Sequence, residues 1–387
     1  MTIFIYLIIM ISFVDTFSQL PIMSPFAQSL GATPFFIGVV VGMYSLTNMV
    51  GNIFSGFWID KEGTRRVLLF GLVASGLVLF AYAFVNTVPQ LLVARFLHGL
   101  SGGILVPAAF TFLANRGDGA KRGKTMALSG AAVGLAAVIG PAFGGIVTSK
   151  FGIEWVFIVI GSLMIVTAGV TRWLLPHTPA QLTEVKQAGQ QNTTSFVGLL
   201  KVLPLLYAYI GSFSLMFAQG VLAYMLPLKV EALNYGSALS GMLFGVFGIT
   251  AIFIFILPTN RLFDRFPHEY TMTVGMVIIG AALFLLSMVT GQTVMYGIMM
   301  LYGTGFAFIF PSINALIVQH TSAENRGKAF AVFYALFSLG VVVGSFVTGV
   351  FDLSADTSFV VGSAVLIVNS IVIWTLSLLA LKRESLV

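Results

Sequence analysis

The stretch "GFWIDKEGTRR", residues 56–66, brings acids, bases and two glycines together in a chain that is otherwise strongly apolar. Of the 387 residues, 58% are hydrophobic and only 8% are charged, and the mean hydropathy is +1.01. Soluble domains do not have this composition. The sequence therefore indicates an integral membrane protein, in which residues 56–66 form a charged loop between two membrane spans.

Apolar runs long enough to cross a bilayer as helices, roughly 20 residues each, recur on both sides of this loop. The first run has no basic residues before it and no small-residue cleavage site, so we expect a retained helix and not a signal peptide. The absence of cysteine excludes disulfides and thiolate metal sites. We predict an all-α membrane protein of twelve spans: 3–29, 34–59, 66–86, 88–115, 121–149, 153–175, 202–230, 236–260, 270–290, 292–321, 325–352 and 357–381.

The positive charges set the expected orientation. Of the 19 lysines and arginines, 16 fall on one side of the predicted spans, whereas Lys150 and Lys229 fall on the other and Arg95 lies within a span. Cytoplasmic loops carry the excess of such residues, so we expect both termini in the cytoplasm and a multi-pass protein of the cell (inner) membrane. The isoelectric point near 9.5 then reflects topology, and no nucleic-acid partner is expected.

The chain repeats itself across a polar segment at 176–200. We therefore expect an N-terminal six-helix bundle (1–175), a cytoplasmic linker (176–200) and a C-terminal six-helix bundle (201–387). An even number of spans in each half makes the halves parallel repeats, an architecture that favours transport. A constant offset of 204 pairs Asp60 with Asp264, Lys61 with Arg265, Gly99 with Gly303, Pro107 with Pro311, Gly140 with Gly344 and Gly145 with Gly349.

The opening loop resembles the signature loop of the major facilitator superfamily. Its residues are Gly56, Asp60, Lys61, Gly63, Arg65 and Arg66, with Thr64 where the family has a basic residue. The resemblance implies a latch between the two halves, in which Asp60 works with Arg65 or Arg66. The second copy keeps Asp264 and Arg265. The alternative is that these charges only enforce topology and solubility.

Asp15 is the one acid predicted near the middle of a span. A carboxylate there is costly, by roughly 2.5–3.5 kcal/mol on insertion scales, so it should face a cavity. Low dielectric favours the protonated form of an unpaired carboxyl, which makes Asp15 a candidate proton carrier. Ser12 and Gln19 share its helix face.

Arg95 and His98 lie three residues apart in the fourth span and therefore share a face. The run resembles the superfamily motif Arg-x-x-Gln-Gly-x-Gly of proton-coupled members, with His98 in place of Gln and Gly99 after it. The resemblance implies that Arg95 takes part in proton coupling, and His98 adds a group that titrates. Two alternatives are a static Asp15–Arg95 ion pair and a packing role for His98.

The fifth span contains Gly140, Pro141, Gly144 and Gly145. This run resembles the motif that marks drug:proton antiporters of the 12-helix efflux group, although Ala136 replaces an upstream glycine of that pattern. Proline kinks a helix and glycines allow close packing. The alternative is ordinary glycine-rich packing.

If the fold is that of the family, the first, fourth, seventh and tenth spans line the substrate cavity. Aromatic and methionine side chains there suit an amphipathic ligand. One acid faces one Arg and one His, which favours neutral, zwitterionic or anionic molecules. The candidate cavity residues are Gln19, Met216, Phe217, Gln219, Tyr224, Phe306, Phe310 and Asn314.

The sequence thus predicts a proton-coupled exporter of a drug or metabolite, working by alternating access as an antiporter. It is expected to act as a monomer, with no cofactor or metal and with the proton gradient as driving force. The main alternative is an uptake symporter of the same fold. An intramembrane enzyme would need clustered acids, histidines or metal ligands at a membrane face, and a sensor without transport would tolerate the loss of Asp15.

Overall fold

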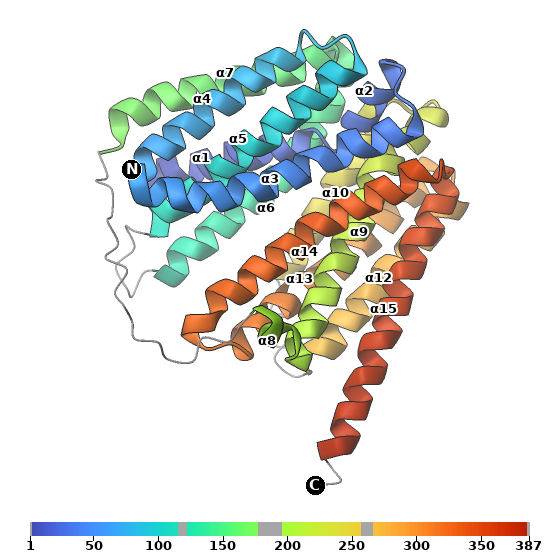
Figure 1. Cartoon of the computed structure of the whole chain (residues 1–387). Helices are drawn as coiled ribbons and strands as arrows, with labels where there is room; N and C mark the ends of the chain where they lie inside the picture. Colours follow the sequence, from blue (N-terminus) through green and yellow to red (C-terminus); the bar gives the residue numbers. More distant parts are fainter. Residues whose placement is uncertain (1, 115–121, 177–195, 257–265, 385–387) are drawn as a thin grey trace. The chain divides into compact units, whose positions relative to one another are not determined.

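The computed structural model describes residues 2–114, 122–176, 196–256 and 266–384 (Figure 1). Within these ranges all regular structure is α-helical. Only helices and closed barrels satisfy every backbone polar group in lipid, and the long apolar runs form helices. The helices are α1 Thr2–Ser18, α2 Met23–Ser29, α3 Pro34–Glu62, α4 Thr64–Tyr82, α5 Val88–Ala114, α6 Arg122–Phe151, α7 Ile153–Leu174, α8 Phe196–Leu200, α9 Leu203–Ala232, α10 Ser237–Ile256, α12 His268–Met288, α13 Gln292–Gln319, α14 Ala323–Val350 and α15 Ala355–Glu384.

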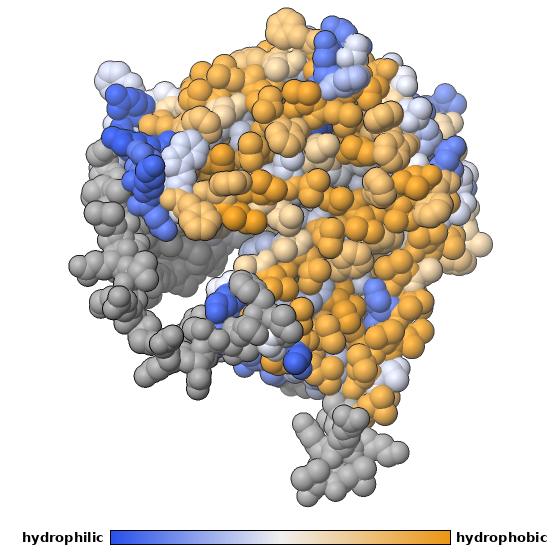
Figure 2. Space-filling model, in the orientation of Figure 1, coloured by the Kyte–Doolittle hydropathy of each residue, from blue (hydrophilic) through white to orange (hydrophobic). Residues whose placement is uncertain are grey.

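Eleven of the described helices are long and apolar enough to cross a membrane, and the bent pair α1 and α2 makes a twelfth if it forms one span. The prediction of an all-α membrane protein with twelve apolar segments is therefore confirmed. Hydrophobic residues cover most of the helix surface seen in Figure 2. Ile53 is 60% exposed and Phe253 63% exposed, as expected of side chains that face lipid.

The first span is not continuous, contrary to the prediction for 3–29. α1 and α2 meet at an angle of 45°, and residues 19–22 between them form a turn. Pro21 explains the break, because it has no N–H to donate and its ring clashes with the preceding helical turn. Gln19 is the first residue of this break.

The chain forms two compact units. Unit 1 takes in Met1–Lys186 and Leu226–Gly245, and unit 2 takes in Gln187–Met225 and Val246–Val387. Residues 226–245 come from the second half of the sequence, so these units do not coincide with the sequence halves. The division into 1–175, 176–200 and 201–387 stays a prediction about the repeats.

The internal repeat is visible in how helices pack inside each unit. In unit 1, a β-carbon added at Gly99 would overlap the carbonyl oxygen of Tyr44, where α5 touches α3. In unit 2, a β-carbon at Gly303 would lie 2.6 Å from the carbonyl oxygen of Phe247, where α13 touches α10. Gly303 lies 204 residues after Gly99, and Phe247 lies 203 residues after Tyr44. Each glycine is needed because the facing backbone leaves no room for a side chain.

The neighbouring helices obey the same correspondence. A β-carbon at Gly71 of α4 would lie 2.9 Å from the Cα of Leu105 in α5, and one at Gly275 of α12 would lie 2.7 Å from Cγ1 of Ile309 in α13. Gly275 lies 204 residues after Gly71, and Ile309 lies 204 residues after Leu105. Residues of the two halves can therefore be compared position by position.

Candidate functional site

Four polar side chains from α1 and α5 meet inside unit 1. We call Asp15, Gln19, Arg95 and His98 the polar cluster. Asp15 lies in the last turn of α1, and Gln19 directly follows the C-terminal end of that helix. Arg95 and His98 lie on one face of α5, and α5 packs against α1. The exposed fractions are 2% for Asp15, 4% for Gln19, 6% for Arg95 and 0% for His98. The cluster is closed off from solvent in this conformation.

Asp15 is paired with His98. Nε2 of His98 lies 2.8 Å from Oδ2 of Asp15. The rings of Tyr44 and Tyr82 meet the imidazole edge-on, at centroid distances of 5.2 and 5.6 Å, and Oη of Tyr82 lies 3.5 Å from Nδ1 of His98. A carboxyl and an imidazole in direct contact, enclosed by aromatic rings, can hold and exchange a proton.

Gln19 stands between Asp15 and Arg95. Nη1 of Arg95 donates to Oε1 of Gln19 at 2.6 Å, and Nε2 of Gln19 donates to Oδ1 of Asp15 at 2.9 Å. Among the described residues, Arg95 and Asp15 form no direct ion pair. The static Asp15–Arg95 pair considered from sequence is therefore not present, and Gln19, predicted to line the substrate cavity, is a buried member of the cluster.

Arg95 is also anchored to α3. Its Nε donates to the carbonyl oxygen of Val40 at 2.9 Å and its Nη2 to that of Val41 at 3.3 Å. Its Cζ lies 4.9 Å from the centroid of the Tyr44 ring, which adds a cation–π contact. The guanidinium thus joins α3 to the end of α1.

Tyr44 and Tyr82 were not predicted from sequence. The hydroxyl of Tyr44 lies 2.9 Å from that of Thr16 on α1, and the Tyr82 ring stacks on Phe157 of α7 at 4.5 Å. Nothing in the sequence distinguishes them among the 11 tyrosines. Their role depends on the rotation of α3 and α4 against α5.

The glycine motif of α6 forms two close helix contacts. A β-carbon at Gly144 would overlap the backbone of Ser18 on α1, and one at Gly140 would lie 2.8 Å from Cβ of Phe17. On the other side, Oγ of Ser237 donates to the carbonyl oxygen of Gly145 at 3.2 Å. The motif therefore holds α6 against the helix that carries Asp15, and Pro141 lies inside the same helix.

The opening loop is a single-residue connection. Gly63, with φ of 80° and ψ of 150°, stands alone between α3 and α4. Arg66 forms an ion pair with Glu62 at 2.7 Å, and Arg65 donates to the carbonyl oxygen of Arg172 at the end of α7. Asp60 is exposed and forms no ion pair with a described side chain.

The expected pairing of Asp60 with Arg65 or Arg66 is therefore not seen in this conformation, where Glu62 is the acid that holds Arg66. Lys61 is exposed, and Gly56 has open space around its Cα. Asp264 and Arg265 lie outside the described residues. The latch stays a prediction.

The predicted cavity residues of the second half lie in unit 2. Tyr302 donates to Oε1 of Gln219 at 3.3 Å, and the rings of Phe306 and Phe310 stack at 5.7 Å. Asn314 donates to the carbonyl oxygen of Phe310 at 2.7 Å. The three remaining members are buried, namely Met216, Phe217 and Tyr224. Their contact with substrate stays a prediction.

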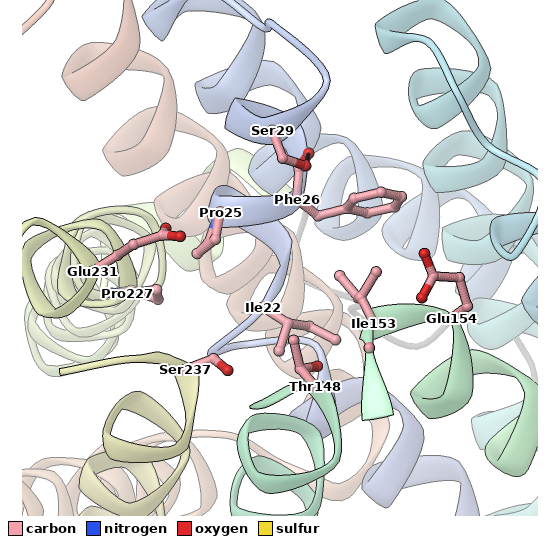
Figure 3. Close-up of a pocket in the computed structure, with 11 residues that line it drawn as sticks. Ile22, Pro25, Phe26, Ser29, Thr148, Ile153, Glu154, Pro227, Glu231 and Ser237 are labelled. Atoms are coloured by element: carbon pink, nitrogen blue, oxygen red, sulfur yellow. Dashed lines mark hydrogen bonds between the residues drawn. The ribbon is translucent and has the colours of Figure 1, made fainter. Parts of the chain in front are cut away.

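Unit 1 also contains a pocket of about 320 Å³ that was not predicted (Figure 3). Two exposed carboxylates, Glu154 and Glu231, lie on opposite sides of it. None of its lining residues belongs to the polar cluster. The other lining residues are Ile22, Pro25, Phe26, Ser29, Thr148, Gly152, Ile153, Pro227 and Ser237.

The sequence profile of the Major Facilitator Superfamily matches residues 5–256 and again residues 208–385. The chain belongs to the major facilitator superfamily. This superfamily membership makes the chain a multi-pass membrane transporter of a small molecule and not an enzyme. The resemblance inferred from the opening loop is confirmed.

Related superfamily members match over most of their length. An uncharacterized MFS-type transporter of Methanocaldococcus jannaschii is 26% identical over 329 residues, which is 84% of each chain. The multidrug resistance protein MdtG of Escherichia coli is 24% identical over 371 residues, covering 92% of this chain and 89% of that one. The multi-drug resistance efflux pump PmrA of Streptococcus pneumoniae is 24% identical over 332 residues, covering 84% and 82%.

Solved structures share the superfamily fold. The nucleoside transporter NupG aligns with a TM-score of 0.79 at 16% identity, covering 97% of this chain and 99% of that one. A bacterial homolog of the human lysosomal transporter Spinster aligns with a TM-score of 0.80 at 13% identity, covering 97% and 96%. At these identities the likeness establishes the fold alone.

Proposed function

We propose that the chain is a proton-coupled secondary transporter that exports a small amphipathic molecule by alternating-access antiport. The observation that carries this proposal is the contact of 2.8 Å between Asp15 and His98 inside unit 1. Ionisable residues within membrane helices are costly and mark ion or proton pathways. In this proposal Asp15 carries the proton, His98 shares it, and Arg95 responds to the charge on the pair.

The second half of the chain supplies an internal comparison. With the offsets of 203 and 204, the four cluster positions correspond to residues that are apolar or uncharged and fully buried. The second half therefore buries these positions without charge, so a six-helix repeat of this chain does not require the polar cluster. The corresponding residues are Ala218, Leu222, Met299 and Tyr302.

Export is favoured over uptake by two observations. The run Gly140, Pro141, Gly144 and Gly145 resembles the antiporter motif and packs α6 against α1. Two of the relatives are named as multidrug resistance or efflux proteins. An antiporter of this kind uses the inward proton gradient to drive its substrate outward.

The substrate is proposed to be an amphipathic drug or metabolite that is neutral, zwitterionic or anionic. One acid, one arginine and one histidine make the polar cluster neutral to slightly positive, which does not favour cations. The stacked rings of Phe306 and Phe310 suit the apolar part of such a molecule. The proton gradient is the driving force in this proposal, and no cofactor is needed.

The proposed transporter is a monomer of the cell (inner) membrane with both termini in the cytoplasm. The charge distribution supports this orientation. In one conformation of the transport cycle the charged cytoplasmic loop at 56–66 acts as a latch between the two halves, and Asp264 with Arg265 forms the second one.

Proteoliposomes that contain a trapped pH dye test the proposal. The protein is challenged with a panel of cationic, anionic and neutral amphiphiles, beside Asp15→Asn and the control Glu154→Gln, which changes an exposed carboxylate of the same unit. Antiport predicts that an added substrate makes the lumen alkaline, because protons leave as substrate enters, and that Asp15→Asn abolishes this change. An acidified lumen would identify the alternative, an uptake symporter.

A further inference from the structure

Gln19 occupies an unusual place for a buried amide, because it lies at the break between α1 and α2. Its backbone carbonyl oxygen accepts from the N–H of Met23 at 3.0 Å, which starts the turn into α2. Its side chain is 4% exposed and contacts three members of the polar cluster. The residue that begins the helix break is therefore also the residue that joins Asp15 to Arg95.

Arg95 decides which way the Gln19 amide faces. A guanidinium only donates hydrogen bonds, so the atom of Gln19 at 2.6 Å from Nη1 of Arg95 has to be Oε1. The NH₂ group then faces the other way, 2.9 Å from Oδ1 of Asp15 and 3.3 Å from Nδ1 of His98. A flipped amide would set the NH₂ group against the guanidinium.

The amide in turn decides the tautomer of His98. The NH₂ group of Gln19 has two hydrogens and three acceptors within reach, namely Oδ1 of Asp15 at 2.9 Å, the backbone carbonyl oxygen of Asp15 at 3.3 Å and Nδ1 of His98 at 3.3 Å. Because this group has no lone pair to offer, a hydrogen on Nδ1 of His98 would find no acceptor in it. The ring proton of neutral His98 is then on Nε2, which donates to Oδ2 of Asp15 at 2.8 Å. The resting pair therefore consists of a carboxylate and a neutral imidazole.

A second proton on the imidazole meets a facing donor. Nδ1 of His98 faces the NH₂ group of Gln19 at 3.3 Å, and Nε2 already carries the proton that it donates to Oδ2 of Asp15. A proton on Nδ1 therefore places two donors head to head, whereas each oxygen of Asp15 keeps a second lone pair that faces neither donor. Tyr82 offers only a long contact of 3.5 Å to Nδ1.

We propose that Gln19 is the positioning residue that couples proton binding at Asp15 and His98 to the hold of Arg95 on α1. A second proton on Nδ1 of His98 displaces the Gln19 amide, and Arg95 loses its acceptor on α1 while keeping its bonds to Val40 and Val41 of α3. The end of α1, at its break, is released from α3 and α5. This inference deepens the proposed function, since it describes how the same site would convert a proton into movement.

The helices packed around Asp15 and His98 bring no further carboxyl or imidazole group to the polar cluster within the described residues. α3 and α4 bring the hydroxyls of Tyr44 and Tyr82, α5 brings Arg95 with His98, and α7 brings the Phe157 ring. α6 meets this part of α1 with glycine.

Nitrogen NMR of the full-length protein in lipid, labelled with ¹⁵N in histidine and in the glutamine side chain, tests the inference. His98→Gln and Gln19→Leu assign the two signals. We expect wild-type His98 as the Nε2–H tautomer near neutral pH, and on acidification we expect the Gln19 side-chain signal to shift at the same pH as the His98 ring. An Nδ1–H tautomer, or a His98 titration that leaves the Gln19 signal in place, overturns the inference.

Variants of Gln19 separate positioning from packing. Gln19→Glu accepts from Arg95 but offers an acceptor to Nδ1 of His98, so the ¹⁵N signals of the His98 ring at neutral pH should change toward those of an Nδ1–H form. Gln19→Leu removes the opposing donor and should change the same signals in the same direction by less. Ser12→Ala, a buried change on the same helix face, should leave them unchanged. Identical His98 ring signals in all variants would show that Gln19 only packs.

The NMR measurement does not depend on transport. If the tautomer and the joint titration are found but proteoliposomes show no proton movement with substrate, the proposed function fails and the role of Gln19 in the cluster stands. If protons move with substrate but the Gln19 side-chain signal does not shift at the same pH as the His98 ring signal, the proposed function stands and this inference fails.

Discussion

His98 on α5 and Asp15 on α1 are joined by a contact of 2.8 Å, and the exposed fraction of the Asp15 side chain is only 3%. This pair links two helices through atoms that can exchange a proton. Its partners are fixed in turn, because Gln19 connects it to Arg95 and Arg95 to α3.

Replacing the polar cluster by its second-half counterparts should preserve the fold and abolish transport. The variant combines Asp15→Ala, Gln19→Leu, Arg95→Met and His98→Tyr. Exchanging a buried ionic network for packed apolar residues is often neutral or stabilising, by about 1–4 kcal/mol. We expect a thermal unfolding midpoint in detergent at or above the wild-type value, with no substrate-linked proton movement.

The single change Asp15→Ala should behave differently, because it leaves Arg95 and His98 buried without their acid. Removing one partner of a buried pair costs about 3–5 kcal/mol. The unfolding midpoint should fall below that of the four-fold variant. If the single variant were the more stable of the two, the cluster would not be an interdependent network.

His98→Gln and His98→Phe should separate coupling from packing. A glutamine amide at position 98 can donate to Asp15 as the imidazole does, so transport should persist with an altered pH profile. Phenylalanine leaves Asp15 without this donor, and a lost hydrogen bond to a buried charge of about 1.5–3 kcal/mol corresponds to a loss in transport rate of roughly tenfold or more. Transport rates measured across a pH series check both expectations.

Gly144→Ala should disrupt the contact between α6 and α1, because the added β-carbon would overlap the backbone of Ser18. Overpacking of this kind costs about 1–3 kcal/mol. Gly130→Ala on the same helix is the matched control, since nothing lies within 4 Å of its added β-carbon, and alanine improves helix propensity there by about 1 kcal/mol. Thermal unfolding should place the two variants on opposite sides of the wild type.

Gly63→Ala should destabilise the turn between α3 and α4. The backbone at Gly63 has φ of 80° and ψ of 150°, a region that is essentially restricted to glycine and costs about 1–3 kcal/mol for other residues. Gly56→Ala is the control, because open space surrounds it within α3. Equal unfolding midpoints for the two variants would contradict the assigned role of Gly63.

Much of the fold could be predicted from sequence, because lipid requires long apolar helices and the repeated glycines mark where backbones touch. The break at residues 19–22 was missed, since a count of apolar residues does not register what Pro21 removes. The burial of Asp15, Arg95 and His98 could also be predicted, because charge in an apolar span must be enclosed.

The pairing within the cluster could not be predicted. Periodicity places Arg95 and His98 on one face, but which of them meets Asp15 depends on the rotation of α5 against α1, and glycine contacts far along the chain set that rotation. For the same reason the contacts of Tyr44 and Tyr82 with His98 could not be predicted from the sequence. In the charged loop, Glu62 holds Arg66 because the two lie four residues apart across the Gly63 turn, a local preference that the family pattern does not describe.

The central claim is that Asp15 and His98 bind the proton that transport exchanges for substrate. Proton release on substrate addition to purified protein in weakly buffered detergent, at a pH low enough for the pair to hold its second proton, tests it most directly when followed with a pH indicator. The account predicts release from the wild type and from Glu154→Gln, and none from Asp15→Asn. Equal release from wild type and Asp15→Asn would contradict it, because the proton would then come from another site.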